Sequence, residues 1–396
     1  MVGSGGALLG TLRPVLAESR WWPEVASVVR AVRERDGIDV VILRLLSAER
    51  DRQPGGKVTY LAEVARRRVE ESLVVSAAPD GVLDEHPLRN AYAKPGGPQH
   101  DLEWATSVLA ARGLEATGPA EQIKTWNLSS LWRIPLAGED AWLKTVPPFF
   151  QHEGALIDAL SPQRGVPRLL GHERGRALLA EIPGEDLFEA TLEQRRGMIE
   201  LLVALQHAWM GRAAPLLALG LPDFRSAALG RNIEWVFERR RHELGAEDAA
   251  LLTAFISTLH GRFEALAACG LPDSLVHGDF HSGNLRGSGQ QLTLLDWSDA
   301  GVGHPLLDQA AFLAATPEEQ RPLLREHWQR VWQSALPQSD PAQAARWVEP
   351  LAAARQAVIY QQFLDHIEPA EAPYHEHDPT EWLQRTAAVL RTAPTP

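Results

Sequence analysis

The sequence predicts an α+β protein with two lobes, a small lobe rich in β-strands followed by a mostly helical lobe, and a small α+β unit ahead of both. Three observations predict this class. Short apolar strand patterns gather between residues 121 and 187, and helical patterns dominate from residue 192 to the end. A loop rich in Pro and Gly at residues 84–100 separates the first part of the chain. The length of 396 residues suits two or three domains.

The first part of the chain is expected to contain a β-hairpin. Residues 39–46 are strongly apolar and rich in β-branched side chains, and residues 57–64 alternate after the turn signal QPGG. Residues 65–75 are charged and then apolar, which fits either a helix or a further strand. This part contains no nucleotide-binding motif, so residues 1–100 are interpreted as a separate small domain linked by residues 84–100.

The strand-rich part is expected to begin with a helix. Residues 101–113 have a helical pattern that ends at a glycine. Strand patterns follow at residues 121–126, 131–136 and 141–146. A later strand in ALLAEIPGEDL, residues 177–187, ends at a Pro-Gly pair, which is typical of a hinge between two lobes.

Helical patterns fill the last part of the chain. Residues 192–210 place Ile199, Leu202 and Leu205 on one face at 3.6-residue spacing. Two further helices are expected at residues 231–241 and 246–268, and the chain from residue 322 onward is mostly helical in pattern.

Composition restricts the classes of function. The formal net charge of −12 disfavours nucleic-acid binding, which depends on basic surface, and it suits a cationic substrate such as an amino sugar. The chain has no apolar run of about 20 residues and no positively charged leader with a cleavage site, so we expect a cytoplasmic protein without a membrane partner. The single cysteine, Cys269, excludes an internal disulfide.

The stretch HGDFHSGNLRGSGQQLTLLDW, residues 277–297, carries the most specific pattern. It contains Asp279, then Asn284 five residues later, and Asp296 at the end of an apolar run. Phosphoryl transfer needs a carboxylate that orients the attacking hydroxyl, together with a carboxamide and a second carboxylate that hold Mg²⁺ against the phosphates. These three residues supply that set in the required order.

A second pattern supplies the matching part of a kinase. Lys144 lies in the short apolar strand pattern AWLKTV, and Glu153 follows in the next expected helix. A strand lysine paired with a helix glutamate is how kinases hold a cation on the α- and β-phosphates of the nucleotide.

With these motifs the chain resembles the aminoglycoside phosphotransferase and choline kinase-like family, the small-molecule branch of the protein-kinase-like fold. The match extends from near residue 105 to near residue 390. It implies a bilobal kinase-like fold with an N-terminal cap domain at residues 1–100, a nucleotide-binding N-lobe at 101–183, and a helical C-lobe at 184–396 with the catalytic loop and the substrate site. By analogy of position and size, the cap is similar to those that some sugar kinases of this family carry.

The resemblance also implies an activity. The expected protein is an ATP- and Mg²⁺-dependent phosphotransferase that phosphorylates a hydroxyl of an aminoglycoside, an amino sugar or other sugar, or an amino alcohol. Carried over by position, Asp279 would be the catalytic base, Asn284 and Asp296 the Mg²⁺ ligands, Lys144 the phosphate-binding lysine and Glu153 its partner. ATP is expected in the cleft at the hinge.

The nucleotide site departs from the protein-kinase pattern at one point. The chain lacks a G-x-G-x-x-G loop and has TWNLSSLWRIPL at residues 125–136 instead. Ser129 and Ser130 are turn formers whose hydroxyls and amides are expected to contact phosphate. In the hinge, the backbone of Ala180 and Ile182 would meet adenine.

The substrate site is less specific in the sequence. In this family substrate selection lies in the C-lobe, so Glu368 and Glu371 are candidates for binding an ammonium group, and His281 and Asp299 for lining the site. Asp308 precedes an apolar helix start and is interpreted as a helix N-cap that helps to hold the catalytic loop.

Two alternatives remain open from the sequence. His277, Asp279 and His281 would share one face of a strand, as in a metal-dependent hydrolase, although a metal site needs further ligands. If His277 is not a metal ligand, its expected role is structural, namely a hydrogen bond that holds the catalytic loop. Because the glycine loop is missing, a catalytically inactive kinase-like protein that binds a nucleotide is the other alternative.

Overall fold

The computed structural model describes residues 2–3, 7–49, 55–64, 73–74, 81–288 and 291–392. The chain forms two compact units, of which unit 1 comprises Met1–Gly154, Arg168–Glu181 and His366–Tyr374. Unit 2 comprises Ala155–Pro167, Ile182–Asp365 and His375–Pro396. Unit 1 is rich in strands and unit 2 is mostly helical, which confirms the predicted α+β class. The expected domain boundaries at residues 100 and 183 stay predictions.

Unit 1 is built on a five-stranded antiparallel sheet with the strand order β6-β7-β8-β10-β9. The strands are β6 (Glu121–Trp126), β7 (Ser129–Ile134), β8 (Ala141–Thr145), β9 (Leu169–Glu173) and β10 (Arg176–Ala180). Three strands predicted between residues 121 and 146 are therefore confirmed, with shifts of up to two residues at their ends.

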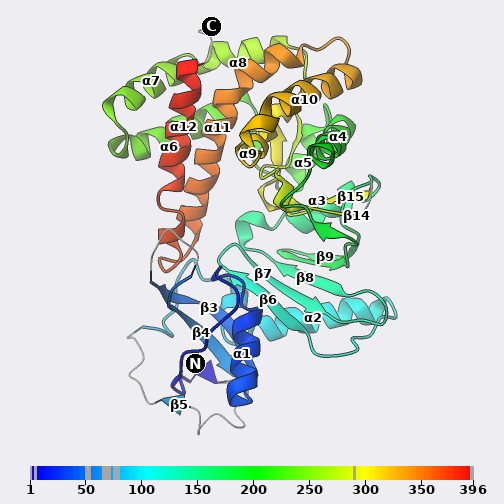
Figure 1. The fold of residues 1–396 in the computed structure, drawn as a ribbon, viewed down its shortest axis with the longest axis vertical. Helices are drawn as coiled ribbons and strands as arrows, with labels where there is room; N and C mark the ends of the chain where they lie inside the picture. The colour runs from blue at the N-terminus through cyan, green and yellow to red at the C-terminus, as the bar shows by residue number, and fades with distance from the viewer. Residues whose placement is uncertain are drawn as a thin grey trace. The chain divides into compact units, whose positions relative to one another are not determined.

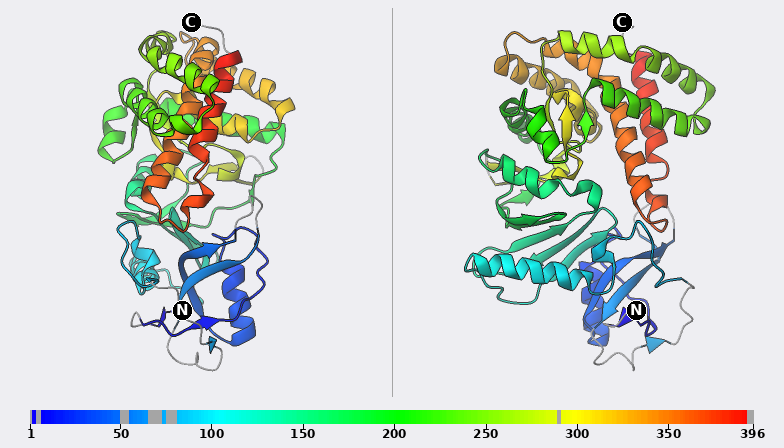
Figure 2. Two further views of the ribbon diagram at one scale, coloured as in Figure 1. Left: turned by 90° about the vertical axis from the view of Figure 1, so that its left-hand side faces the viewer. Right: turned by 180° about the vertical axis from the view of Figure 1, so that it is seen from behind.

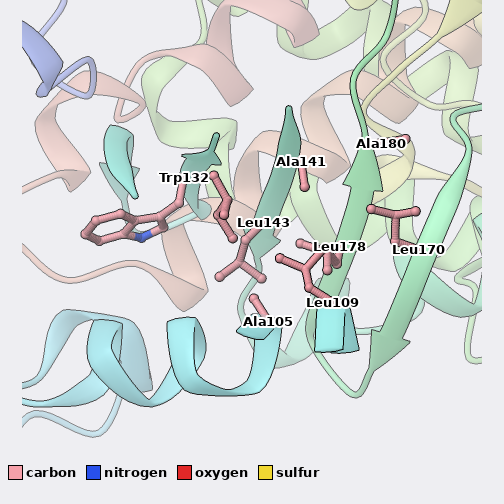
Figure 3. Packing of buried hydrophobic residues seen from close by; sticks show 9 residues of the cluster. Ala105, Leu109, Trp132, Ala141, Leu143, Leu170, Leu178 and Ala180 are labelled. Atoms are coloured by element: carbon pink, nitrogen blue, oxygen red, sulfur yellow. The ribbon is translucent and has the colours of Figure 1, made fainter. Parts of the chain in front are cut away.

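Helix α2 (Gly97–Ala111) packs on one face of this sheet (Figure 3). Leu109 of the helix and Leu143 and Leu178 of the sheet are at most 2% exposed, so each contributes roughly 1.5–3 kcal/mol through burial. The helix begins four residues earlier than predicted, because Pro98 in its first turn has a φ that is preorganised for a helix.

The predicted hairpin of the N-terminal part is confirmed as β3 (Val40–Ala48) and β4 (Val58–Val64), which pair antiparallel. Helix α1 (Ala26–Asp36) packs against it. The side chain of Gln122 joins the hairpin to β6, since its amide donates to the carbonyl of Ile42 at 2.7 Å and accepts from the N–H of Ile42 at 2.8 Å. Of residues 65–75, only β5 (Leu73–Val74) lies within the described residues.

Unit 2 consists mainly of long helices (Figure 1). They are α4 (Leu192–Ala208), α6 (Ser226–Arg240), α7 (Ala246–Ser257), α8 (Leu259–Ala268), α10 (Arg321–Ala335), α11 (Pro341–His366) and α12 (Asp378–Thr392). Figure 2 shows α11 and α12 side by side in both views. The described residues contain no helix that is long and apolar enough to cross a membrane.

The prediction of one helix over residues 246–268 was wrong, because the helix breaks at Thr258. The hydroxyls of Ser257 and Thr258 donate to the carbonyls of Ala254 and Phe255. Such side-chain bonds to the backbone compete with helix continuation. The chain therefore turns between α7 and α8.

Small sheets position the predicted catalytic segment within unit 2. Strand β13 (Ser274–Val276) ends directly before His277, and it pairs with β16 (Gly301–Gly303). Strands β14 (Leu285–Ser288) and β15 (Gln291–Leu294) form an antiparallel pair in which Leu285 lies opposite Leu294. Asn284 and Asp296 therefore lie near the same end of the β14–β15 pair.

Candidate active site

The loop after β13 is held by a buried carboxylate. Asp308 is fully buried, and its two oxygens accept hydrogen bonds from the N–H groups of His277 at 2.9 Å and Gly278 at 2.8 Å. Burial raises the pKa of Asp308, and His277 and Arg355 oppose that rise. The prediction that Asp308 holds this loop is confirmed. The predicted capping role is wrong, because this side chain makes no cap bond to the following helix α9 (Gln309–Ala314).

Glycine is required at position 278. Its φ is +95°, and a Cβ at this position would lie 2.0 Å from the carbonyl oxygen of Asp299. The loop that carries Asp279 therefore contacts the segment that follows Asp296 directly.

Asp279 lies at the centre of a short hydrogen-bond network. The Nδ2 atom of Asn284 donates to the backbone carbonyl of Asp279 at 2.8 Å and to its Oδ2 at 3.0 Å. Because both partners are acceptors, the Asn284 nitrogen faces Asp279 and its carbonyl oxygen Oδ1 is turned elsewhere. The Asp279 side chain is 41% exposed, so it is accessible to solvent.

His281 is the second partner of Asp279. Its Nδ1 accepts from the N–H of Gly283 at 3.0 Å, so the proton of the neutral ring lies on Nε2, which is 3.3 Å from Oδ2 of Asp279. Burial favours the neutral form of Asp279, but the hydrogen bond and charge of His281 outweigh it and lower the pKa of Asp279. Burial lowers the pKa of His281, but the hydrogen bond and the negative charge of Asp279 outweigh burial, so the pKa of His281 is raised.

Asp296 has an uncommon backbone conformation. Its φ is 58°, the single positive value of a non-glycine residue among the described residues. This region costs an L-residue roughly 1–2 kcal/mol, and such strain concentrates at functional sites. The preceding residue is fixed to Asn284, because the N–H of Leu295 donates to the carbonyl of Asn284 at 2.8 Å.

His277 is a fully buried structural residue. Its Nε2 lies 2.8 Å from the carbonyl oxygen of Leu295 and its ring packs against Trp297. Burial lowers its pKa, which keeps the ring neutral. The premise that His277, Asp279 and His281 share a strand is wrong, since β13 ends at Val276. The described residues contain no cluster of three or more His, Cys, Asp or Glu suited to a metal ion.

Lys144 and Glu153 form the predicted pair in unit 1. Lys144 lies on β8 and Glu153 begins helix α3 (Glu153–Leu160). Nζ of Lys144 lies 2.7 Å from Oε1 of Glu153, and the side chains are 12% and 3% exposed. The short distance and low exposure make this a strong ion pair that fixes the direction of the lysine.

The turn between β6 and β7 is tightly held. The hydroxyl of Ser129 accepts from the indole of Trp126 at 2.8 Å, and that of Ser130 accepts from the indole of Trp132 at 3.1 Å. Both serines are buried. The hydroxyls predicted to contact phosphate thus support neighbouring tryptophans within the sheet.

The acidic candidates of the C-terminal region also lie in unit 1. Glu371 is buried and its Oε2 accepts from the N–H of Asn127 at 2.8 Å, while Glu368 pairs with Arg89 at 2.9 Å. Burial raises the pKa of Glu371 to about 8. Arg89 belongs to residues 84–100, so the segment predicted as a linker is tied by this ion pair to residues 366–374 of the same unit.

Three predicted positions remain, of which Ala180 and Ile182 lie on either side of the change from unit 1 to unit 2 along the chain. Ala180 ends β10, and its N–H donates to the carbonyl of Arg168 at 2.9 Å. Ile182 is half-buried and begins the next stretch of unit 2. Asp299 is half-buried beside Gly278, and its backbone carbonyl accepts from Arg355.

Sequence reasoning missed the buried polar residues around the loop, namely Gln206, Arg355 and Gln356. Gln206 donates to Asp308 at 2.9 Å, and Gln356 donates to the carbonyl of Gly278 at 3.1 Å. The one available signal was the Arg-Gln pair inside the otherwise apolar run AAARQAVI of the C-terminal region.

A cavity of about 1100 Å³ lies among α6, α7 and α8, and it contains none of the predicted site residues. Its walls include Phe224, Phe237 and Phe263. Because Asp279, Asn284 and Asp296 do not line it, the chemistry assigned to those residues does not take place there.

Comparison with known proteins agrees with the fold and the motif. The sequence model described as the phosphotransferase enzyme family matches residues 137–347, which include Lys144, Glu153, Asp279, Asn284 and Asp296. No curated protein matches the chain.

Several solved structures share the protein-kinase-like fold. The ethanolamine kinase of Plasmodium vivax has a TM-score of 0.53 at 11% identity, over 74% of this chain and 89% of that one. A Ralstonia eutropha protein described as an aminoglycoside phosphotransferase has a TM-score of 0.52 at 14% identity, over 74% and 99%. The GDP complex of aminoglycoside 2'-phosphotransferase-IIIa has a TM-score of 0.50 at 12% identity, over 73% and 99%.

Proposed function

This chain belongs to the phosphotransferase enzyme family, and we propose that it transfers the γ-phosphoryl group of Mg²⁺-bound ATP to a hydroxyl group of a small molecule. Membership makes it a small-molecule kinase; the nucleotide, the metal and the residue roles are our proposal. The observation that carries it is the network in which Asn284 turns its amide nitrogen to Asp279.

Asp279 is the proposed catalytic base. Two donors, Asn284 and His281, bind its Oδ2, and we assign Oδ1 to the hydroxyl of the acceptor. The acceptor oxygen bonds to the γ-phosphorus while the bond from phosphorus to the bridging oxygen breaks and ADP leaves. The hydroxyl proton passes to the carboxylate of Asp279. Because the transition state is loose, orientation of the hydroxyl matters more than basicity.

Asn284 and Asp296 are the proposed Mg²⁺ ligands. A hard cation prefers carboxylate and carbonyl oxygens, and the Asn284 amide supplies its Oδ1 because its nitrogen is bound by Asp279. The exposed side chain of Asp296 supplies the carboxylate. When bound, Mg²⁺ would neutralise charge on the phosphate oxygens.

Nucleotide binding is assigned to a lysine on β8 and to the backbone at the end of β10 and just after it. Lys144, oriented by Glu153 at 2.7 Å, supplies the cation for the α- and β-phosphates. Ala180 and Ile182 would meet adenine through their backbone. Ser129 and Ser130 are proposed to act indirectly, because their hydroxyls are bonded to tryptophans and their part is to shape the β6–β7 turn.

The acceptor is proposed to be an aminoglycoside, an amino sugar or other sugar, or an amino alcohol. The net charge of −12 favours a cationic one. His281 and Asp299 are the proposed lining residues. Glu368 and Glu371 are bonded to Arg89 and Asn127, so we propose that they join segments within unit 1 rather than bind the ammonium group.

The experiment that tests this function is ADP release across amino sugars, neutral sugars, aminoglycosides and amino alcohols with Mg²⁺ and ATP. We expect at least one acceptor to give ADP release, and we expect that release to be lost in Asp279→Asn and in the absence of Mg²⁺. If Mg-ATP raises the melting temperature but no acceptor releases ADP, the inactive nucleotide-binding alternative gains support. If neither binding nor turnover occurs, the proposal fails.

A further inference from the structure

Arg355 is a charged residue in an apolar part of α11, the longest helix among the described residues. It lies in α11, its side chain is 0% exposed, and its neighbours Ala354 and Ala357 are also fully buried. Burial lowers the pKa of its guanidinium, and the negative charge of Asp308 opposes that shift. Burying an arginine costs free energy that burying an apolar side chain such as methionine would not. A purely packing role therefore does not explain this residue.

The guanidinium of Arg355 binds two backbone carbonyls from different segments. Its Nη1 donates to the carbonyl of Gly278 at 3.0 Å and its Nη2 donates to the carbonyl of Asp299 at 3.3 Å. The guanidinium also lies 4.2 Å from the centre of the Phe224 ring. The donors of an arginine have a fixed planar arrangement, so one side chain sets the spacing of the two carbonyls.

Those two carbonyls belong to the segments with the proposed chemistry. The carbonyl of Gly278 is part of the peptide bond to Asp279, and Asp299 is three residues after Asp296. The segments already touch, since a Cβ at Gly278 would lie 2.0 Å from the Asp299 oxygen. Any shift of one carbonyl against the other would therefore change the position of Asp279 relative to Asp296.

Gly278 is held from two directions. Its N–H donates to Asp308 at 2.8 Å, while its carbonyl accepts from Arg355 at 3.0 Å and from Gln356 at 3.1 Å. With both ends of this residue bound, the peptide plane that leads into Asp279 has a single orientation.

We propose that Arg355 is a positioning residue for phosphoryl transfer, which fixes the loop of the base Asp279 against the loop of the metal ligand Asp296. This inference rests on the proposed roles of those two residues. Arg355 lies outside residues 137–347 that match the family, so the family match does not include it.

The chain offers a matched control in Arg262 on α8. Arg262 is 6% exposed, and its guanidinium lies 5.3 Å from the centre of the Phe255 ring and 5.4 Å from that of Trp347. It is thus a buried arginine stacked on aromatic rings, as Arg355 is, but neither ring belongs to the catalytic loop. Replacing it should affect stability without affecting the chemical step.

The test compares Arg355→Lys and Arg355→Met with Arg262→Lys and Arg262→Met in the full chain. Lysine keeps the charge but offers a single nitrogen, so it cannot hold both carbonyls in the arginine geometry. For Arg355→Lys we expect kcat to fall by about 100-fold, with KM for ATP and for the acceptor changed by less than about threefold. The Mg²⁺ concentration for half-maximal rate should rise. The Arg262 variants should keep wild-type kcat in the fraction that is folded.

A second measurement separates positioning from folding. Arg355→Ala leaves a guanidinium-sized space, so millimolar guanidinium should raise its kcat while urea at the same concentration does not. Folding is checked by circular dichroism and melting temperature. The proposal is overturned if kcat of Arg355→Lys stays at the wild-type value. It is also overturned if kcat falls by the same factor as the fraction of folded protein. A wild-type protein without any turnover would instead reject the proposed function.

Discussion

At the scale of single residues, the site depends on which atom each side chain turns toward its neighbours. Asn284 and His281 both approach Oδ2 of Asp279, at 3.0 and 3.3 Å. These residues lie within a span of six in the sequence, so their proximity could be predicted from the motif, whereas the contact of His281 with Asp279 was not, because His281 was predicted to line the substrate site. The orientation of the Asn284 amide and the tautomer of His281 could not, since both follow from the backbone that the loop adopts.

His281→Asn is expected to move the acid limb of kcat/KM to higher pH. The base acts as a carboxylate, and in the wild type His281 lowers the pKa of Asp279 against the effect of burial. Without His281 the burial effect remains, so the pKa of Asp279 rises and less carboxylate is present at a given acidic pH. A pH–rate profile measures this. His260→Asn, an exposed control, should leave the profile unchanged, and an unshifted limb in His281→Asn would refute the coupling.

Asp296→Gly is expected to keep the stability of the protein and to lose its activity. Glycine adopts a φ of 58° without strain, which offsets its greater freedom in the unfolded chain. The metal ligand is lost, so kcat should fall by orders of magnitude. Thermal melting and ADP release measure the two effects. If Asp296→Gly is active, Asp296 is not a metal ligand. If the variant is clearly less stable than the wild type, the positive φ of Asp296 does not strain the folded protein.

At the scale of elements, contiguous patterns were predictable and distant contacts were not. Strands β7 and β8 and the helix α4 follow from local periodicity, because each buries one regular face. The break between α7 and α8 depends on the hydroxyls of Ser257 and Thr258, and the hydrophobic periodicity of the sequence does not reveal their hydrogen bonds. Arg355 acts on a loop 77 residues earlier, and no local pattern indicates its partner.

Gln122→Leu tests how the N-terminal hairpin is attached to β6. The amide of Gln122 makes two buried hydrogen bonds to Ile42, and leucine would leave the backbone groups of Ile42 without those partners. We expect the free energy of unfolding to fall by about 2–4 kcal/mol in a urea titration. The exposed Gln99→Leu serves as control. A loss below about 0.5 kcal/mol would mean that the hairpin does not depend on this side chain.

At the scale of the whole molecule, unit 1 gathers residues from three stretches of the chain. Segment His366–Tyr374 belongs to unit 1, although α11 before it lies mainly in unit 2. The bond between Asn127 and Glu371 joins residues 244 positions apart. From the sequence, Glu368 and Glu371 were predicted to bind substrate. Their burial against distant residues depends on tertiary packing, which the local composition does not reveal.

Glu371 should make the stability of the protein depend on pH. Its pKa is raised from 4.5 to about 8 in the folded state, so the folded protein binds a proton more tightly than the unfolded chain. Stability is therefore greatest below the ordinary pKa and falls as the pH rises through about 8. Melting temperatures from pH 5 to 9 should decrease in the wild type by more than in Glu371→Gln. Equal slopes would show that Glu371 is not buried as a neutral group.

The central claim is that Asp279 orients the acceptor hydroxyl while other residues bind the nucleotide. The most direct measurement is turnover and Mg-ATP binding of Asp279→Asn beside the wild type, with the acceptor found in the ADP-release panel. We predict that kcat falls by orders of magnitude while the affinity for Mg-ATP stays nearly the same. Wild-type turnover in Asp279→Asn would contradict the account.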